Sequence, residues 1–482
     1  MPGERRKLIV LHTNDIHSHF EQMPKIATAI RQLKQSHPLD PVITVDIGDH
    51  MDRMRVETDG TEGQANVEVM NATGYNLAVP GNNEGLTFTM QQLEAAYSSK
   101  AKFDVLASNM GMMPSGRLPY WLKPYQIRDW FGVKVAFLGV TAYYPDFYQL
   151  LDWKLDDPLP NVARWVERLK EEADSIIVLS HLGLTNDRRM AEQISGIDLI
   201  LGAHTHHLLE EPLLVENTYI GAAGKFGQYV GEMELTYDTS LKKLERVEGR
   251  VIEVDSYEEA GDVVEIIERC REQGKAYLST TITSLDRPLT IAWRQESGLG
   301  NLLASGVRRW VDAEVGIINA GQLLGGLEEG PVTKLRLLQV CPSPINPCKF
   351  WLRGDHLALA LEQSLLDEFI DKEIRGFGFR GKVLGMLCLD GIDVDYDAAA
   401  PSYHKIRQIY INGLPLEPER HYLVGSLDMF TFGVGYLSLS KGTGTEYYLP
   451  EFLREVLEHQ LSIGIDWDSF SASHWREIGK KD

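Results

Sequence analysis

Cysteine is scarce in this chain, which has four cysteines among 482 residues. They are widely spaced and include no Cys-x-x-Cys pair: Cys270, Cys341, Cys348 and Cys388. This pattern argues against a disulfide-stapled fold and against a cysteine-based zinc site. We therefore expect buried free thiols and a core large enough to fold without staples.

Long apolar runs are also missing. Nowhere do about 18 consecutive apolar residues occur, which is the length that a membrane-spanning helix needs. Arg5, Arg6 and Lys7 resemble the start of a signal peptide, but only residues 8–11 are apolar before His12. That run is too short for a secretory signal. The sequence predicts a cytoplasmic protein with no membrane partner.

Positive charge is in short supply. Lys and Arg number 48 against 69 Asp and Glu, which gives a formal net charge of −21. Such a chain repels nucleic acid and anionic lipid, so neither is an expected partner. An anionic substrate would need local positive charge, which metal ions supply. The sequence contains no P-loop and no Gly-x-Ser-x-Gly run, so ATPase and serine-hydrolase chemistry have no motif.

The length of the chain predicts two domains. In residues 1–255, short β-rich runs alternate with helical patterns, which is typical of a layered α/β domain. Strands are predicted at 8–12, 42–45, 77–79, 105–107, 133–140, 176–179 and 199–201. A charged helical stretch at 256–280 should connect this domain to a second α/β unit, 281–482, which contains a hairpin turn at Asn412-Gly413.

Five polar segments follow apolar runs, at the points where strands should end. They are Asp15-Ile16-His17, Gly48-Asp49, Gly81-Asn82-Asn83-Glu84, Ser180-His181 and His204-Thr205-His206. Because the carboxyl ends of strands in an open α/β sheet meet at one crevice, these segments should converge. Each alone would pass for a cap or a turn. Together, in this order, they predict a metal site.

The residue types favour two divalent ions held by oxygen and imidazole ligands. Asp49 is the natural bridging carboxylate. The other ligands divide into Asp15, His17 and His206 for one ion, and Asn82, His181 and His204 for the other. His204 and His206 alternate along the chain, so both rings can point to one side of an extended stretch. Zinc and manganese both suit this ligand set.

These segments resemble the motifs of calcineurin-like metallophosphoesterases, and more narrowly those of the 5′-nucleotidase and UDP-sugar hydrolase family. The second half of the chain carries that family's later motifs in order: Glu296-Ser297-Gly298-Leu299-Gly300-Asn301-Leu302, Gly316-Ile317-Ile318-Asn319-Ala320-Gly321, Gly330-Pro331-Val332-Thr333 and Pro344-Ile345-Asn346-Pro347. The chain is most similar to a cytoplasmic, YunD-like subgroup.

The resemblance implies an αββα-type phosphoesterase domain, followed by a C-terminal α/β substrate-binding domain. It also implies the same seven metal ligands, two zinc or manganese ions, and a small phosphorylated substrate such as a nucleotide. The nucleophile would be metal-bound hydroxide, and the role would lie in nucleotide catabolism.

Three positions depart from the family pattern. Asn83 stands where the motif has a catalytic His, Leu324 stands where it has an Arg, and Val434 where it has an Asp. Asn cannot donate a proton, a loss commonly worth about 10²–10⁴ in rate, but its amide can donate a hydrogen bond to a phosphoryl oxygen. His50 or His19 could take over as the acid, or each could instead be a supporting or surface histidine. Substrates with good leaving groups would depend least on an acid that protonates the leaving group.

Substrate binding is expected from Asn319 and Gly321, from a basic loop carrying Arg375 and Arg380, and from Phe430. The loop could instead be a solvated turn, and the ring could be a core side chain. The predicted function is two-metal hydrolysis of a phosphate ester or anhydride of a nucleotide or nucleotide-sugar. The alternative is a catalytically weak protein that binds metal and ligand.

Overall fold

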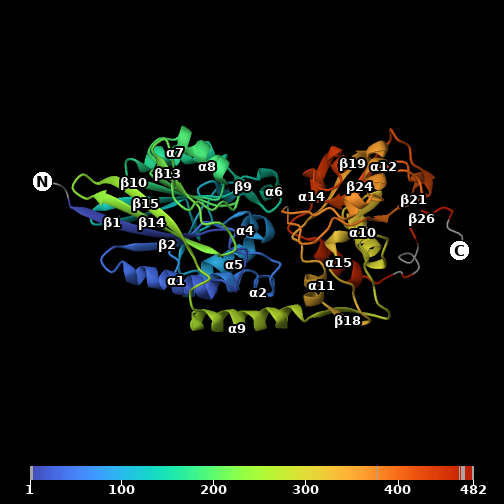
Figure 1. Ribbon diagram of the computed structural model, residues 1–482, viewed down its shortest axis with the longest axis horizontal. Helices are drawn as coiled ribbons and strands as arrows, with labels where there is room; N and C mark the ends of the chain where they lie inside the picture. Colours follow the sequence, from blue (N-terminus) through green and yellow to red (C-terminus); the bar gives the residue numbers. More distant parts are fainter. Residues whose placement is uncertain (1–3, 377, 466, 468–472, 480–482) are drawn as a thin grey trace. The chain divides into compact units, whose positions relative to one another are not determined.

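In the computed structural model, which describes residues 4–376, 378–465, 467 and 473–479, the chain divides into two units, 1–275 and 276–482. The first unit contains two large sheets (Figure 1). One has seven strands in the order β15-β14-β1-β2-β3-β4-β6. Their bounds are β1 (Arg5–Thr13), β2 (Val42–Asp46), β3 (Leu77–Ala78), β4 (Asp104–Leu106), β6 (Leu122–Lys123), β14 (Tyr229–Asp238) and β15 (Lys243–Glu253).

The other sheet has six strands in the order β12-β13-β11-β10-β8-β7. Their bounds are β7 (Tyr125–Trp130), β8 (Val133–Val140), β10 (Ser175–Ser180), β11 (Leu199–Gly202), β12 (Leu213–Val215) and β13 (Thr218–Gly221). β1 to β4 are parallel, and so are β8, β10, β11 and β13. Their apolar runs are buried on both faces, as central parallel strands require. Parallel order brings the carboxyl ends of these strands to one edge of each sheet.

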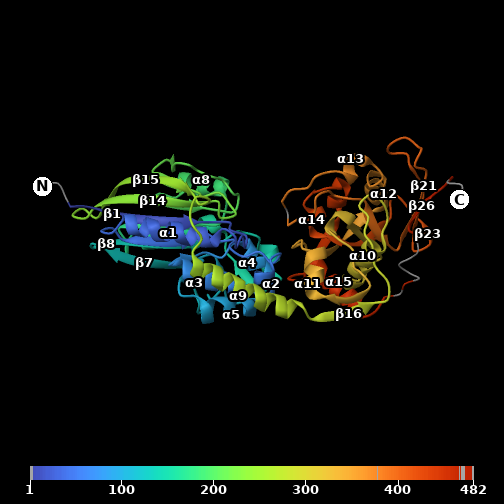
Figure 2. The same ribbon diagram turned by 60° about the horizontal axis from the view of Figure 1, so that its bottom comes forward.

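A buried apolar layer joins the two sheets. Val10 and Val45 from the first sheet share one core cluster with Phe137, Leu179 and Leu201 from the second, all 0% exposed. Helices α7 (Pro158–Leu169) and α8 (Leu184–Gln193) pack on the second sheet through another cluster. α1 (Met23–Ser36) lies along the first sheet with its apolar face buried (Figures 1 and 2). The predicted αββα layering is confirmed.

Helix α9 (Gly261–Leu278) lies within the stretch 256–280 that the sequence predicts as a connector. Ion pairs tie it to the first unit: Arg31–Asp262, Glu68–Arg269 and Glu57–Arg271. A Cβ on Gly60 would lie only 2.4 Å from the Cα of Gly274, so glycine is required at this contact. The helix is therefore packed along this unit up to its last turn.

The second unit contains a five-stranded sheet, β20-β17-β24-β19-β25, and a four-stranded sheet, β23-β22-β21-β26. Their bounds are β17 (Val315–Asn319), β19 (Pro347–Arg353), β20 (Leu387–Asp390), β21 (Ile392–Tyr396), β22 (Ile406–Ile411), β23 (Leu414–Pro415), β24 (His421–Leu427), β25 (Thr443–Tyr447) and β26 (Trp475–Glu477). α10 (Gly298–Trp310) and α15 (Leu453–Ser462) share one core with the strands. The predicted Asn412-Gly413 turn joins β22 to β23, with φ of 48° and 81°.

All four cysteines are buried and free, as the composition predicts. Burial raises the pKa of Cys341 and of Cys388 to about 12, so both stay protonated and unreactive. Across the described residues, no helix has the length and apolar character to cross a membrane.

Candidate metal centre

The predicted ligands lie where strands of the two sheets end. Asp15 and His17 follow β1, and Asp49 follows β2. Asn82 follows β3 as the first residue of α4 (Asn82–Thr87). His181 comes directly after β10, and the pair His204 and His206 follows β11. Both sheets of the unit therefore contribute ligands.

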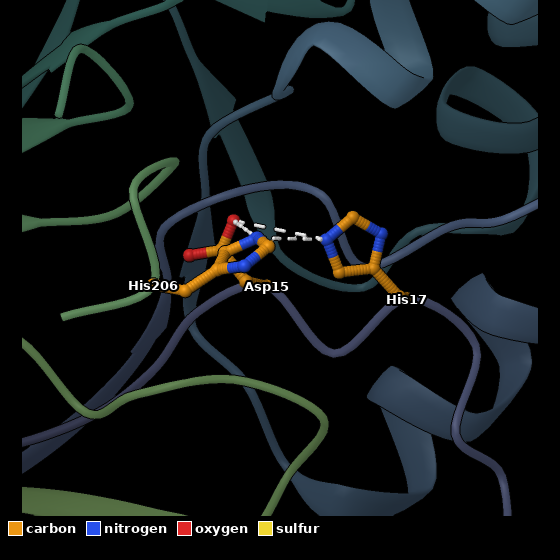
Figure 3. A group of neighbouring side chains, drawn as sticks. All are labelled: Asp15, His17 and His206. Atoms are coloured by element: carbon orange, nitrogen blue, oxygen red, sulfur yellow. Dashed lines mark hydrogen bonds and ion pairs between the residues drawn. The ribbon is translucent and has the colours of Figure 1, made fainter. Parts of the chain in front are cut away.

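One group consists of Asp15, His17 and His206, whose side chains converge from separate loops (Figure 3). Nε2 of His17 lies 3.3 Å from Nε2 of His206 and 3.9 Å from Oδ1 of Asp15. Nε2 of His206 lies 3.5 Å from the same oxygen. Three ligand atoms thus surround one point, at distances that a shared cation would bridge.

A second group consists of Asp49, His181 and His204, whose ligand atoms also lie within 4.8 Å of one another. Oδ1 of Asp49 is 3.4 Å from Nε2 of His181. Its other oxygen, Oδ2, is 3.9 Å from Nε2 of His17 in the first group. Asp49 therefore faces both groups, which is the position that a bridging carboxylate needs.

Two buried atoms without hydrogen-bond partners show that the residues fit a cation. They are Nε2 of His181 and Oδ1 of Asn82. Nδ1 of His181 lies 2.6 Å from the carbonyl oxygen of Ile47, so it donates its proton there and leaves a lone pair on Nε2. An imidazole lone pair and an amide oxygen held in this way are common ligands of divalent metals.

The electrostatics of the site also favour a cation. Burial lowers the pKa of His17 and of His204, so both rings stay neutral, as metal ligation requires. Burial opposes the charged form of His181 as well, but the carboxylates of Asp49 and Asp15 raise its pKa to about 10. The centre therefore attracts positive charge, which a metal ion can provide in place of that proton.

The ligand loops have unusual backbone conformations. Five ligand residues have φ between 48° and 71°, a region that residues other than glycine seldom adopt: Asp15, His17, Asp49, His204 and His206. Each such residue costs roughly 1–3 kcal/mol, and such strain gathers at functional sites. Hydrogen bonds between the loops hold the conformation, with the Asp15 amide donating to Gly48 O at 2.9 Å and the His17 amide to Asp49 O at 2.8 Å.

Glu84 belongs to one of the five predicted segments, but the sequence assigned it no role, and the structure shows that it supports the loops. It is 1% exposed, and its Oε2 accepts from the amides of Asp49 at 3.0 Å and Gly81 at 2.7 Å. Its Oε1 accepts from the amide of Met51 at 2.8 Å. The carboxylate therefore fastens the loop after β2 to the start of α4. In the sequence, its role could have been recognised because Glu84 is the third residue of that helix, the position of the acidic residue in a capping box.

Asn83 points toward a metal ligand. Its Nδ2 donates to Met51 O at 2.9 Å and lies 3.0 Å from Nδ1 of His17. Its backbone amide donates to Oδ1 of Asp49 at 2.8 Å. The side-chain amide is thus occupied in positioning His17, on the side of the ring away from Nε2.

The two histidines that could replace the missing acid both have other side chains as partners. His50 is 2% exposed, its Nδ1 lies 3.1 Å from Nδ2 of Asn66, and burial lowers its pKa to about 3. The ring is therefore buried and neutral. His19 is paired with Glu21 at 2.8 Å and lies against the ring of Phe226, with ring centroids 4.3 Å apart.

Tyr144 also contacts the site, and the sequence reasoning did not single it out. It lies between β8 and α6 (Pro145–Gln149), with its Oη 3.1 Å from Nε2 of His204. Burial and the charge of Asp49 raise its pKa, so the phenol stays protonated. In the sequence, the one sign of this contact is that Tyr144 comes soon after a central parallel strand, as the ligands do.

The predicted substrate residues of the second unit are mostly structural. Asn319 is 0% exposed and donates to Leu384 O at 2.6 Å. A Cβ on Gly321 would lie 2.0 Å from the carbonyl oxygen of Val383, so that position is filled by backbone. Phe430 is 0% exposed within the core, edge-on to Tyr436. All three positions are buried in the second unit, and for Phe430 this is the core position that the sequence left open.

The two arginines of the basic loop differ in exposure. The side chain of Arg375 is 89% exposed and paired with Glu373 at 3.1 Å. Arg380 is half-buried, and its amide donates to Oγ of Ser343 at 3.1 Å. Among the predicted residues, those of the metal centre converge into two groups within the first unit.

Comparison with known proteins agrees with this geometry. Residues 8–208 match the calcineurin-like phosphoesterase family, and residues 277–436 match the 5′-nucleotidase C-terminal domain. The metallophosphoesterase YunD of Bacillus subtilis is 36% identical over 462 residues, which cover 95% of this chain and 100% of that protein. A 5′-nucleotidase of Vibrio cholerae is 24% identical over 404 residues, 70% of this chain and 71% of that one.

Solved structures share the fold. NAD nucleotidase of Haemophilus influenzae superimposes with a TM-score of 0.69 at 16% identity, covering 99% of this chain and 98% of that one. A 5′-nucleotidase precursor from Thermus thermophilus gives 0.59 at 20% identity, covering 98% and 100%. With these matches, the chain belongs to the calcineurin-like metallophosphoesterases that carry a 5′-nucleotidase C-terminal domain, a family of metal-dependent hydrolases of phosphoester bonds.

Proposed function

We propose that this chain hydrolyses a phosphate ester or anhydride of a nucleotide or nucleotide-sugar at a two-metal centre. The observation that carries the proposal is the position of Asp49, which belongs to one three-residue group and faces the other. Beside it, Nε2 of His181 and Oδ1 of Asn82 are buried without a hydrogen-bond partner. Two divalent ions bound there would polarise the phosphoryl group and activate water at neutral pH. Zinc and manganese both suit the residues present.

The protein's own groups fix where that chemistry occurs. Burial opposes the charged form of Asp49, but the imidazole of His181 lowers its pKa below the usual range, so the bridge stays ionised. Asp15 is held by the amide of His204, which donates to it at 3.0 Å, and by Asn14 at 2.8 Å. Ligands held this firmly need little rearrangement when substrate binds.

The choice of nucleotides and nucleotide-sugars rests on relatives and on one residue. Relatives are named nucleotide phosphoesterase, 5′-nucleotidase and NAD nucleotidase. Asn83 cannot protonate a leaving group, and its amide is already engaged with Met51 O and His17. We therefore favour anhydrides such as UDP-sugars and dinucleotides over simple monoesters, because a phosphate leaving group departs without protonation.

The experiment is a substrate panel assayed with manganese or zinc: nucleoside monophosphates, cyclic nucleotides, UDP-sugars and NAD. Asp49→Asn sets the background, because it removes the bridging charge. Asp129→Asn is the matched control, since Asp129 only accepts a turn hydrogen bond from Gly132 on the surface. We expect turnover of at least one anhydride by the wild type and by the control, and loss of that turnover in Asp49→Asn.

The missing acid group favours one rival. Without it, the centre would bind metal and a phosphorylated ligand with little turnover. If no member of the panel is hydrolysed faster by the wild type than by Asp49→Asn, while nucleotides still bind, this rival is correct and the proposal is not.

A further inference from the structure

The side chains that could replace the missing catalytic histidine are engaged with other groups. Asn83 is engaged with Met51 O and His17, His50 is interior, and His19 is paired with Glu21. Preorganised donors aimed at developing charge are worth about 10²–10³ in rate each. A side chain near the ligands whose hydrogen-bond donor is not used within the protein could fill this role.

Tyr144 lies in the right place. It follows β8, the neighbour of β10 in the second sheet, and it is 39% exposed. Its Oη is 3.1 Å from Nε2 of His204, and the two rings lie edge to face with centroids 6.0 Å apart. A phenol so placed contacts the second ligand group on one side and solvent on the other.

The proton positions leave this phenol with a donor. Because Nε2 of His204 lies within hydrogen-bond distance of Tyr144, Nδ1 is the nitrogen that would remain to bind a metal ion. A neutral imidazole that binds metal through Nδ1 carries its proton on Nε2. The tyrosine oxygen would then accept that proton. The hydroxyl proton of Tyr144 is then free to point at a substrate.

The loop that carries Tyr144 is anchored on both sides. The amide of Thr141 donates to Oδ1 of Asn109 at 2.9 Å, and Nδ2 of Asn109 donates back to Thr141 O at 3.0 Å. Tyr148, one turn of α6 further on, is 0% exposed and donates to Gly81 O at 3.4 Å. A Cβ on Gly85 would lie 2.3 Å from the Tyr148 hydroxyl, so that glycine makes room for the anchor.

We propose that Tyr144 is a catalytic residue, whose hydroxyl donates a hydrogen bond to a non-bridging oxygen of the substrate phosphoryl group. This inference rests on the proposed function. In the reaction, water oxygen bonds to phosphorus and the bond from phosphorus to the leaving oxygen breaks, with its electron pair staying on that oxygen. The water protons pass to solvent. Tyr144 transfers no proton, but it stabilises charge on an oxygen that stays on phosphorus.

The test compares Tyr144→Phe with Tyr143→Phe, using 4-nitrophenyl phosphate and phenyl phosphate. Tyr143 is the neighbouring residue and is similarly exposed, at 42%. For Tyr144→Phe we expect kcat to fall about 10²-fold on both esters by the same factor, because the lost donor serves an oxygen common to both. Bound metal, measured on the same samples, should equal that of the wild type. Tyr143→Phe should match the wild type in all respects.

Three results would overturn the assignment. One is an unchanged kcat in Tyr144→Phe while the wild type is active. Another is a loss that is larger for phenyl phosphate, which would place the donor on the leaving oxygen. The third is a loss that follows a fall in bound metal, because then Tyr144 only positions His204. A wild type no faster than Asp49→Asn on both esters and on every member of the substrate panel would instead overturn the proposed function and this inference with it. Where only an anhydride is hydrolysed, the loss of kcat in Tyr144→Phe is measured on that anhydride.

Discussion

Asn83→Ala tests whether the residue in place of the catalytic histidine positions a metal ligand. The substitution removes an amide nitrogen that lies 3.0 Å from Nδ1 of His17 and 2.9 Å from Met51 O. Groups that orient a ligating histidine through its second nitrogen typically account for about 10–100-fold in metal affinity. That range equals about 1.4–2.7 kcal/mol of binding free energy. We expect a loss of this size for the ion held by His17.

The assay is calorimetric titration of the metal-stripped protein with manganese. Asn71→Ala is the matched control, because the Asn71 amide also donates to a carbonyl oxygen, that of Lys100 at 2.8 Å, but on an exposed surface of the same unit. One of the binding steps should weaken in Asn83→Ala and none in Asn71→Ala. Manganese affinity that is unchanged in Asn83→Ala would refute the reasoning, and Asn83 would then be free to serve the substrate.

Two further predictions concern the second unit. Burial raises the pKa of Asp428 to about 7, so the native protein keeps a proton that the unfolded chain releases near pH 4. The free energy of unfolding, measured in urea, should therefore fall as pH rises from about 4 to 7, and it should fall less in Asp428→Asn. An equal fall in both proteins would contradict the raised pKa of Asp428. Phe430→Ala should cost about 3–5 kcal/mol of unfolding free energy, since the ring fills the core. Arg375→Ala should cost less than about 0.5 kcal/mol, and an equal loss in both would contradict the core placement of Phe430.

The layered fold could be predicted because its central strands are short apolar runs with parallel neighbours. The runs that became β1, β2, β8, β10 and β11 are recognisable by composition alone, and the metal residues follow directly at their ends. Because the carboxyl ends of parallel strands meet at one edge of a sheet, the ligands could be predicted without knowing the conformation of the loops. β13 was missed because it lies between turns and has only four residues.

Burial and side-chain direction could not be predicted at the same level. His50 follows the bridging Asp49, yet its ring faces Asn66 in the interior. For Phe430 the sequence left a stacking position and a core position open, and the ring lies in the core. Tyr144 lies far from every polar segment in the sequence, and the parallel pairing of β8 with β10 and of β10 with β11 brings its loop to His204. Neighbouring strands and packing partners decide these outcomes, and neither is visible in a local pattern.

The most direct test of the two-metal centre is the metal content of the protein after loading with manganese and removal of free metal. We predict about two ions per chain for the wild type and for Asp129→Asn. His206→Ala should keep about one, because the Asp49, His181 and His204 group is intact. Asp49→Asn should lose both, because Asp49 faces each group. A wild type that holds no more than one ion, or an Asp49→Asn variant that holds as many as the wild type, would contradict the account.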